Sequence, residues 1–122
     1  MKILVVDDEL DVQELYKQRF RKEIRSNELT ILFATSAKEA LEILGQMHPM
    51  DIVLLLSDIN MPGMTGLDLL KLAKAEYPWL TIYMITAYGD DESREKAKQL
   101  GAKEYLTKPI DFSLLHQKIF AA

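Results

Sequence analysis

Short runs of apolar residues recur along the chain, and each is followed by a segment whose apolar positions are three or four residues apart. An apolar run of strand length predicts a strand buried on both faces, and the wider spacing predicts a helix after it. The predicted strands are Lys2–Asp7, Leu29–Ala34, Ile52–Ser57, Thr81–Thr86 and Lys103–Leu106. The pattern therefore predicts five strand–helix units.

Local signals mark the ends of several predicted helices. Thr65 and Asp68 have the spacing of a capping box, and Asp111 can cap the last helix. The first helix is expected to be continuous, because its apolar residues keep one helical spacing. This stripe consists of Val12, Leu15, Tyr16, Phe20 and Ile24.

Apolar strands that alternate with helices indicate a parallel sheet covered on both faces and linked by right-handed crossovers. With 122 residues, 48% of them hydrophobic, the chain fits one domain with a sizeable core. We therefore expect a single α/β domain over residues 1–122. Its five-stranded parallel sheet should be doubly wound and flavodoxin-like, with strand order 2-1-3-4-5 and five flanking helices.

The composition excludes several classes of protein. The chain has no cysteine, which excludes disulfides and thiolate-bound zinc, and no apolar stretch approaches the roughly 20 residues of a membrane span. A net charge of −4 argues against nucleic-acid binding by this domain. We expect a soluble, cytoplasmic protein that binds no membrane. One basic cluster, predicted to be a solvated helix face, consists of Lys17, Arg19, Arg21, Lys22 and Arg25.

Polar residues stand at the ends of four of the five predicted strands. They are Asp7 and Asp8 after the first, Asp58 after the third, Thr86 after the fourth and Lys108 just past the fifth. Taken singly, each residue could have a purely structural role. An acid that precedes a helix stabilises its positive N-terminal end, and most lysines are solvated surface residues. Ligands of doubly wound sheets, however, sit beyond the carboxyl ends of the strands. We therefore expect these side chains to share one edge.

Adjacent first and third strands would bring Asp8 close to Asp58. Two carboxylates about 4 Å apart repel by roughly 4 kcal/mol at an effective dielectric constant near 20. A Mg²⁺ ion would relieve this repulsion, because it prefers oxygen ligands such as carboxylates, waters and phosphate. Asp58 could then act as a covalent acceptor of a phosphoryl group, with Mg²⁺, Lys108 and Thr86 covering the phosphoryl oxygens.

Four motifs in this order resemble one known family over essentially the whole chain. They are Asp7-Asp8, Asp58 with Asn60-Met61-Pro62 and Gly66, Met84-Ile85-Thr86-Ala87, and Lys108-Pro109. The set is similar to the response-regulator receiver domain of two-component signalling, and in particular to the chemotaxis-type single-domain regulators. The resemblance implies that Asp58 accepts a phosphoryl group from the phosphohistidine of a sensor histidine kinase or phosphotransfer protein.

The resemblance also implies roles for the neighbouring residues. Asp8, Asp58 and the carbonyl of Asn60 would bind Mg²⁺, and Asp7 would help through water. Lys108 would pair with the phosphate, Thr86 would hydrogen-bond it, and the rotamer of Tyr105 would follow Thr86. The Lys108-Pro109 peptide bond would be cis.

Residues around the predicted site should control the access of water to the phosphate and the binding of partner proteins. Ala87 would leave the approach open, and Tyr88 could slow loss of the phosphate by blocking water. The helix beginning at Asp91 has few apolar residues, so it should be weakly anchored and movable. By the resemblance, the fourth helix, fifth strand and fifth helix would bind a downstream effector or output domain, or a second receiver in a phosphorylation-dependent homodimer.

The segment before Asp58 is about two residues longer than in the common receiver pattern, so the third strand should start early or carry a bulge. Two other functions fit part of the pattern. A phosphatase with an aspartyl nucleophile would want a second acid two residues later, where this chain has Asn60. A phosphorylation-independent interaction module would leave the acids unused. We expect a switch, not an enzyme, with at most self-phosphorylation from a donor and self-dephosphorylation.

Overall fold

The computed structural model describes residues 1–46, 51–87 and 91–120, and its centre is a five-stranded parallel sheet in the order β2-β1-β3-β4-β5. The strands are β1 (Lys2–Val6), β2 (Thr30–Ala34), β3 (Ile52–Asp58), β4 (Thr81–Thr86) and β5 (Glu104–Thr107). The predicted sheet and strand order are thus confirmed. Within the described ranges, no helix is long and apolar enough to cross a membrane.

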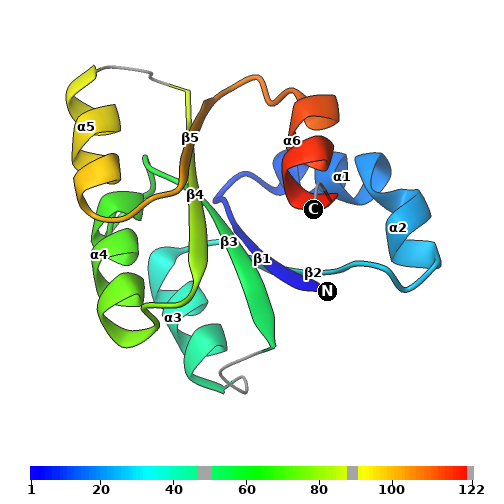
Figure 1. Ribbon diagram of the computed structural model, residues 1–122, viewed down its shortest axis with the longest axis horizontal. Helices are drawn as coiled ribbons and strands as arrows, with labels where there is room; N and C mark the ends of the chain where they lie inside the picture. Colours follow the sequence, from blue (N-terminus) through cyan, green and yellow to red (C-terminus); the bar gives the residue numbers. More distant parts are fainter. Residues whose placement is uncertain (47–50, 88–90, 121–122) are drawn as a thin grey trace.

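Helices cover both faces of the sheet, with α1, α2 and α6 on one side and α3, α4 and α5 on the other (Figure 1). Their bounds are α1 (Leu10–Arg19), α2 (Arg21–Arg25), α3 (Ala37–Gln46), α4 (Gly66–Glu76), α5 (Asp91–Gln99) and α6 (Phe112–Phe120). The Thr65–Asp68 capping box opens α4, and the Asp111 carboxylate accepts the N–H of Leu114 at the start of α6. Both predicted caps are confirmed.

The core lies in two layers because successive strand residues point to opposite faces. In β1, Leu4 and Val6 belong to the cluster beneath α3 and α4, whereas Ile3 and Val5 belong to the cluster beneath α1 and α6. All four side chains are at most 1% exposed. The run of apolar residues in the sequence therefore reflects a strand buried on both faces.

The predicted first helix is interrupted, so the chain has six helical segments among its described residues and not five. Phe20 leaves the helical conformation between α1 and α2, with φ −107° and ψ 17°. After α2 the chain returns to β2, and the carbonyl of Glu23 accepts the N–H groups of Glu28 and Leu29. The predicted apolar stripe is also incomplete, because Leu15 is 43% exposed while Phe20 is buried.

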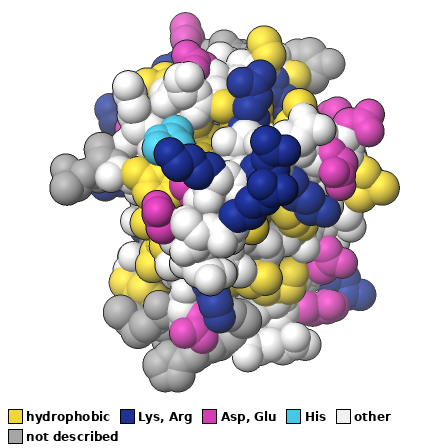
Figure 2. Space-filling model, turned by 90° about the vertical axis from the view of Figure 1, so that its right-hand side faces the viewer, with side chains coloured by type: hydrophobic (Ala, Val, Ile, Leu, Met, Phe, Trp, Pro, Cys, Tyr) yellow, Lys and Arg dark blue, Asp and Glu magenta, His cyan; other side chains and the backbone are white. Residues whose placement is uncertain are grey.

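The basic residues of α1 and α2 are all exposed, as expected for a solvated helix face. Figure 2 shows the face of the molecule that carries α1, α2 and α6, with Lys and Arg side chains gathered near its middle. The elements of this face lie beside the sheet and not beyond its carboxyl edge.

The predicted irregularity before Asp58 is a bulge at Val53. Lys2 of β1 pairs with Ile52, but the next residue, Ile3, pairs with Leu54. Val53 is the extra residue, and it is 48% exposed although it lies in an otherwise buried strand. The bulge takes up additional length at the start of β3, so the end of the strand still places Asp58 at the carboxyl edge of the sheet.

Candidate functional site

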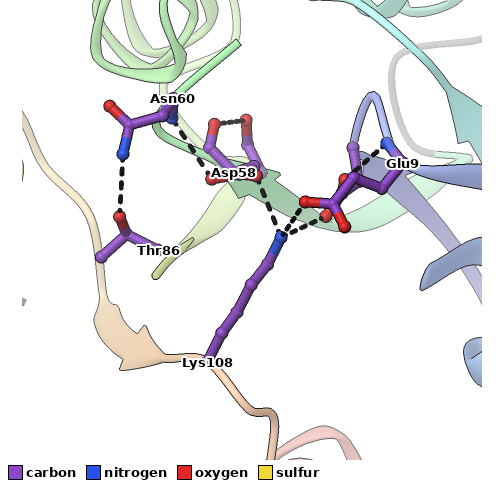
Figure 3. Close-up of polar contacts among 7 residues, drawn as sticks. Glu9, Asp58, Asn60, Thr86 and Lys108 are labelled. Carbon is purple, nitrogen blue, oxygen red and sulfur yellow. Dashed lines mark hydrogen bonds and ion pairs between the residues drawn. The ribbon is translucent and has the colours of Figure 1, made fainter. Parts of the chain in front are cut away.

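The carboxyl ends of the strands bring the predicted polar residues to one edge of the sheet. Asp58 ends β3, Thr86 ends β4, and Asp7 follows β1 directly. Lys108 follows β5, and its peptide bond with Pro109 is cis, as the resemblance implied. Figure 3 shows the Lys108 side chain extended toward the acids, with Asn60 and Thr86 on the other side of Asp58.

The ammonium of Lys108 binds two buried carboxylates at once. Its Nζ donates to Asp7 Oδ2 at 2.9 Å and to Asp58 Oδ2 at 3.0 Å, and it lies 3.7 Å from Glu9 Oε1 (Figure 3). The side chains of Asp7 and Asp58 are only 5% and 7% exposed. Charge-assisted hydrogen bonds of this kind offset part of the cost of burying the two acids.

The second oxygen of Asp58 is also held. Its Oδ1 accepts the backbone N–H of Asn60 at 3.2 Å. Burial raises the pKa of the Asp58 carboxyl, and the hydrogen bond and charge of Lys108 lower it only in part. Burial lowers the pKa of Lys108, but the bonds to Asp7 and Asp58 more than compensate, so the net direction is upward and the ammonium stays charged.

The loop after β1 turns one of its acids into the protein and leaves the next exposed to solvent. Asp7 is buried, and its Oδ1 accepts the backbone N–H of Glu9 at 2.9 Å, whereas Asp8 is exposed. The expected approach of Asp8 to Asp58 is nevertheless confirmed. Four acids each offer one oxygen, and these oxygens lie within 4.8 Å of one another; the acids are Asp7, Asp8, Glu9 and Asp58.

This acidic cluster suits a hard divalent cation, since four carboxylates face the single ammonium of Lys108. The pKa of the buried Tyr16 is raised, first by burial and then by the negative charges of Asp7 and Asp58.

Sequence reasoning did not include Glu9 among the metal ligands. The available signal was its position directly after Asp7-Asp8, at the end of the loop that leads into α1.

Thr86 and Asn60 form the opposite wall of the site. The side-chain amide of Asn60 donates to the Thr86 hydroxyl at 3.3 Å, and Thr86 is buried. The contact links the loop after β3 to the end of β4. Ala87, next to Thr86, is exposed, in keeping with an open approach, whereas Tyr88 lies outside the described residues.

Tyr105 contacts α5. It is half-buried in β5, and the guanidinium of Arg94 on α5 stands 5.0 Å from the centre of its ring. In α5 itself only Ala97 is buried, as its sequence predicted. The contact with Arg94 therefore links Tyr105 to a helix that has a single buried residue.

Comparison with known proteins agrees with this geometry. The profile of the response regulator receiver domain family matches residues 3–120. The response regulator protein PilR of Pseudomonas aeruginosa is 36% identical; the match covers 99% of this chain but 26% of PilR, so the chain spans about a quarter of that relative. Sporulation initiation phosphotransferase F of Bacillus subtilis is 32% identical over 97% of this chain and 90% of its own length.

A solved structure shows the same fold at comparable identity. The CheY-like response regulator receiver domain protein of Methanospirillum hungatei has a TM-score of 0.86 and 30% identity, covering 97% of this chain and 89% of its own. The similarity thus extends over nearly the whole of both chains.

Proposed function

Because the chain belongs to the response regulator receiver domain family of two-component signalling, we propose that Asp58 accepts a phosphoryl group from a phosphohistidine. The donor would be a sensor histidine kinase or a phosphotransfer protein. One observation carries the proposal. Asp58 is a buried carboxylate whose two oxygens are separately held, one by the Lys108 ammonium and the other by the Asn60 N–H. A fixed carboxylate needs little reorganisation to act as a nucleophile.

The donor set fits Mg²⁺. Carboxylate oxygens are its preferred protein ligands, and the acids at this edge carry more negative charge than Lys108 can neutralise. We propose that Asp8, Asp58 and the carbonyl of Asn60 hold the ion, with Asp7 acting through water. When bound, Mg²⁺ would supply positive charge to the phosphoryl oxygens during transfer.

The transfer breaks the P–N bond of the phosphohistidine as an Asp58 oxygen forms a new P–O bond. The imidazole leaves with the bonding electron pair and takes a proton from solvent. Lys108 would move from its carboxylate partners to an oxygen of the phosphoryl group, and the Thr86 hydroxyl would donate a hydrogen bond to another. Positioning and charge neutralisation supply most of the rate in such transfers.

The site favours a switch over a turnover enzyme. An aspartyl phosphatase would want a general acid two residues after its nucleophile, and the amide of Asn60 is too weak an acid to transfer a proton at neutral pH. We therefore propose that the aspartyl phosphate persists long enough to signal. Its loss would proceed by self-dephosphorylation, with Ala87 leaving water an approach and Tyr88 restricting it.

Partners would recognise the phosphorylated state at the surface formed by α5, β5 and α6. These are the predicted fourth helix, fifth strand and fifth helix. A bound phosphoryl group would pull the Thr86 hydroxyl from the Asn60 amide, and Tyr105 would follow with the α5 helix. Weak burial of α5 keeps the cost of this movement low. An effector protein, an output domain or a second copy of the chain would then bind the state it prefers.

Release of inorganic phosphate from phosphoramidate tests this proposal directly. Release should require both Mg²⁺ and Asp58, and should be lost in Asp58→Asn. Asp51→Asn changes an exposed acid at the far end of β3 and should leave release unchanged. Release that continues in Asp58→Asn, or without a divalent cation, would contradict the proposal.

A further inference from the structure

The basic residues of α1 and α2 form a surface that the proposed phosphoryl transfer does not use. We call Lys17, Arg19, Arg21, Lys22 and Arg25 the basic face. A chain of net charge −4 places five of its 15 basic residues within nine positions, and all five are exposed. Figure 2 shows Lys and Arg side chains gathered on the face that carries α1, α2 and α6.

The one acid within this segment is turned away from the surface. Glu23 lies between Lys22 and Ile24, but its side chain is only 12% exposed, and its Oε1 lies 3.2 Å from His116 Nε2 on α6. Its other oxygen is buried with no hydrogen-bond partner among the described residues. The fold therefore withdraws the carboxylate that would otherwise neutralise the basic face.

Four cations of this face have no acidic partner among the described residues. Arg19, Arg21, Lys22 and Arg25 make no ion pair within the part of the chain that the structure describes. Lys17 is partly neutralised by Glu14 at 3.3 Å, whereas the Arg19 guanidinium stands 5.6 Å from the centre of the Phe112 ring on α6. The free positive charge therefore centres on α2 and on the adjoining end of α1.

A hollow of about 310 Å³ adjoins this charge between α1 and α6. It is lined by Arg19, Phe112, Ser113, His116 and Gln117. The lining contains no carboxylate, and it combines an aromatic ring with a guanidinium, a hydroxyl and an amide that can donate hydrogen bonds. Such a lining favours the carboxylate of an incoming side chain.

We propose that the basic face and this hollow dock an acidic segment of a protein partner. One carboxylate side chain would enter the hollow beside Arg19, and neighbouring acids of the same segment would pair with Arg21, Lys22 and Arg25. The hollow favours a polypeptide over a flat bilayer surface, and the few basic groups of an acidic chain do not suffice for nucleic acid. The charges would set specificity and the rate of association more than affinity.

Docking here would leave the phosphoacceptor edge free. The basic face belongs to α1 and α2, which lie beside the sheet (Figure 1), whereas Asp58 is the last residue of β3 at the carboxyl edge of the sheet. The inference therefore stands apart from the proposed phosphoryl transfer. Variants of the basic face should still take a phosphoryl group from a small donor.

Binding of a fluorescent poly-glutamate peptide to the full chain tests the docking site. We expect salt-sensitive binding, with amide NMR shifts confined to α2, the end of α1 and the residues that line the hollow. The triple variant Arg21→Glu, Lys22→Glu, Arg25→Glu should bind at least about tenfold more weakly, because like charges then face the peptide. Gln117→Glu should weaken binding several-fold by placing a carboxylate in the hollow.

A charge-matched triple variant on α4 and α5 provides the control. Lys71→Glu, Lys96→Glu, Lys98→Glu makes the same change at exposed positions elsewhere and should bind the peptide within about twofold of the parent. Equal losses in the two triple variants would overturn the proposal, as would shifts outside the named elements. Tighter binding to oligothymidine, or to phosphatidylcholine vesicles with phosphatidylserine, would overturn it in favour of nucleic acid or membrane.

Discussion

At the scale of single residues, Lys108 supplies the positive charge that lets two buried acids lie side by side. It donates to Asp7 and Asp58 at 2.9 and 3.0 Å, yet the pKa of Asp58 remains raised because burial outweighs the ion pair. The negative charge on Asp58 is therefore unfavourable in the metal-free fold. A bound divalent cation would offset this cost, because it places positive charge beside the carboxylate.

Asp58→Asn should melt at a higher temperature than the parent in metal-free buffer at pH 7. A carboxyl whose folded pKa lies above its unfolded value adds stability at low pH, and this stability is lost as the pH rises through the folded pKa. The advantage of the variant should therefore shrink as the pH falls toward about 4, where the parent is protonated too. Calorimetry at both pH values measures this, with exposed Asp51→Asn as the control. An advantage that grows on acidification would refute it.

Lys108→Ala should destabilise the metal-free protein by about 2 kcal/mol. Removing one partner of a buried ion pair costs about 3–5 kcal/mol, and the 16% exposure of the Lys108 side chain reduces this. Millimolar Mg²⁺ should recover part of the loss by neutralising the acids. Urea unfolding with and without Mg²⁺ measures both effects. Lys71→Ala, at an exposed position on α4, should show neither.

At the same scale, the position of Asp58 could be predicted because an apolar strand ends there and a Pro/Gly loop follows. The burial of Asp7 and the exposure of Asp8 could not, because both follow the strand and only the loop geometry decides their directions. Glu9 was missed as a possible metal ligand for the same reason, because its direction also depends on the loop geometry. The contact of Arg94 with Tyr105 depends on how α5 packs on β5, which a local pattern does not specify.

At the scale of elements, the start of α4 is built against the loop after Asp58. A Cβ atom on Gly66 would clash with the carbonyl oxygen of Asp58 and the Cα of Ile59. The Gly66 N–H also donates to the carbonyl of Ile59 at 2.8 Å. The helix and the site loop therefore hold each other in place.

Gly66→Ala should lower the free energy of unfolding by about 2 kcal/mol or more, because the backbone must shift to accept the methyl group. Gly45→Ala provides a matched control near the end of α3. A Cβ there meets no atom within 4 Å, so the variant should gain about 0.5 kcal/mol from helix propensity. Urea unfolding compares the two. A Gly66→Ala variant as stable as the parent would show that the close contact is not needed.

The α5 helix should exchange its amide hydrogens at least about tenfold faster than α4, because few apolar contacts oppose local opening. Only Ala97 is buried in α5, whereas Leu69, Leu70 and Ala73 anchor α4. Hydrogen exchange followed by mass spectrometry measures the two helices in one experiment. Equal protection would mean that α5 is not the movable element of the switch.

The elements were largely predictable because buried parallel strands leave unbroken apolar runs, and the extra length before Asp58 indicated the bulge at Val53. The break at Phe20 was not predictable. Apolar spacing continues through it to Ile24, and the residues on either side are good helix formers. The turn back to β2 at the carbonyl of Glu23 is a tertiary constraint that overrides this preference.

At the scale of the whole molecule, charge is divided between two regions. Acids gather at the carboxyl edge of the sheet, and uncompensated basic side chains gather on α1 and α2. We propose that the first region binds a cation and a phosphoryl group and that the second binds an acidic partner. Because the two regions share no residue, each can be altered by substitution while the other is measured.

The intact mass of the protein after incubation with Mg²⁺ and acetyl phosphate tests the central claim most directly. The account predicts one added phosphoryl group on the parent and none on Asp58→Asn or in the presence of EDTA. Peptide mapping of the adduct should place it at Asp58. An adduct that survives in Asp58→Asn, or its absence from the parent even with a phosphohistidine donor, would contradict the account.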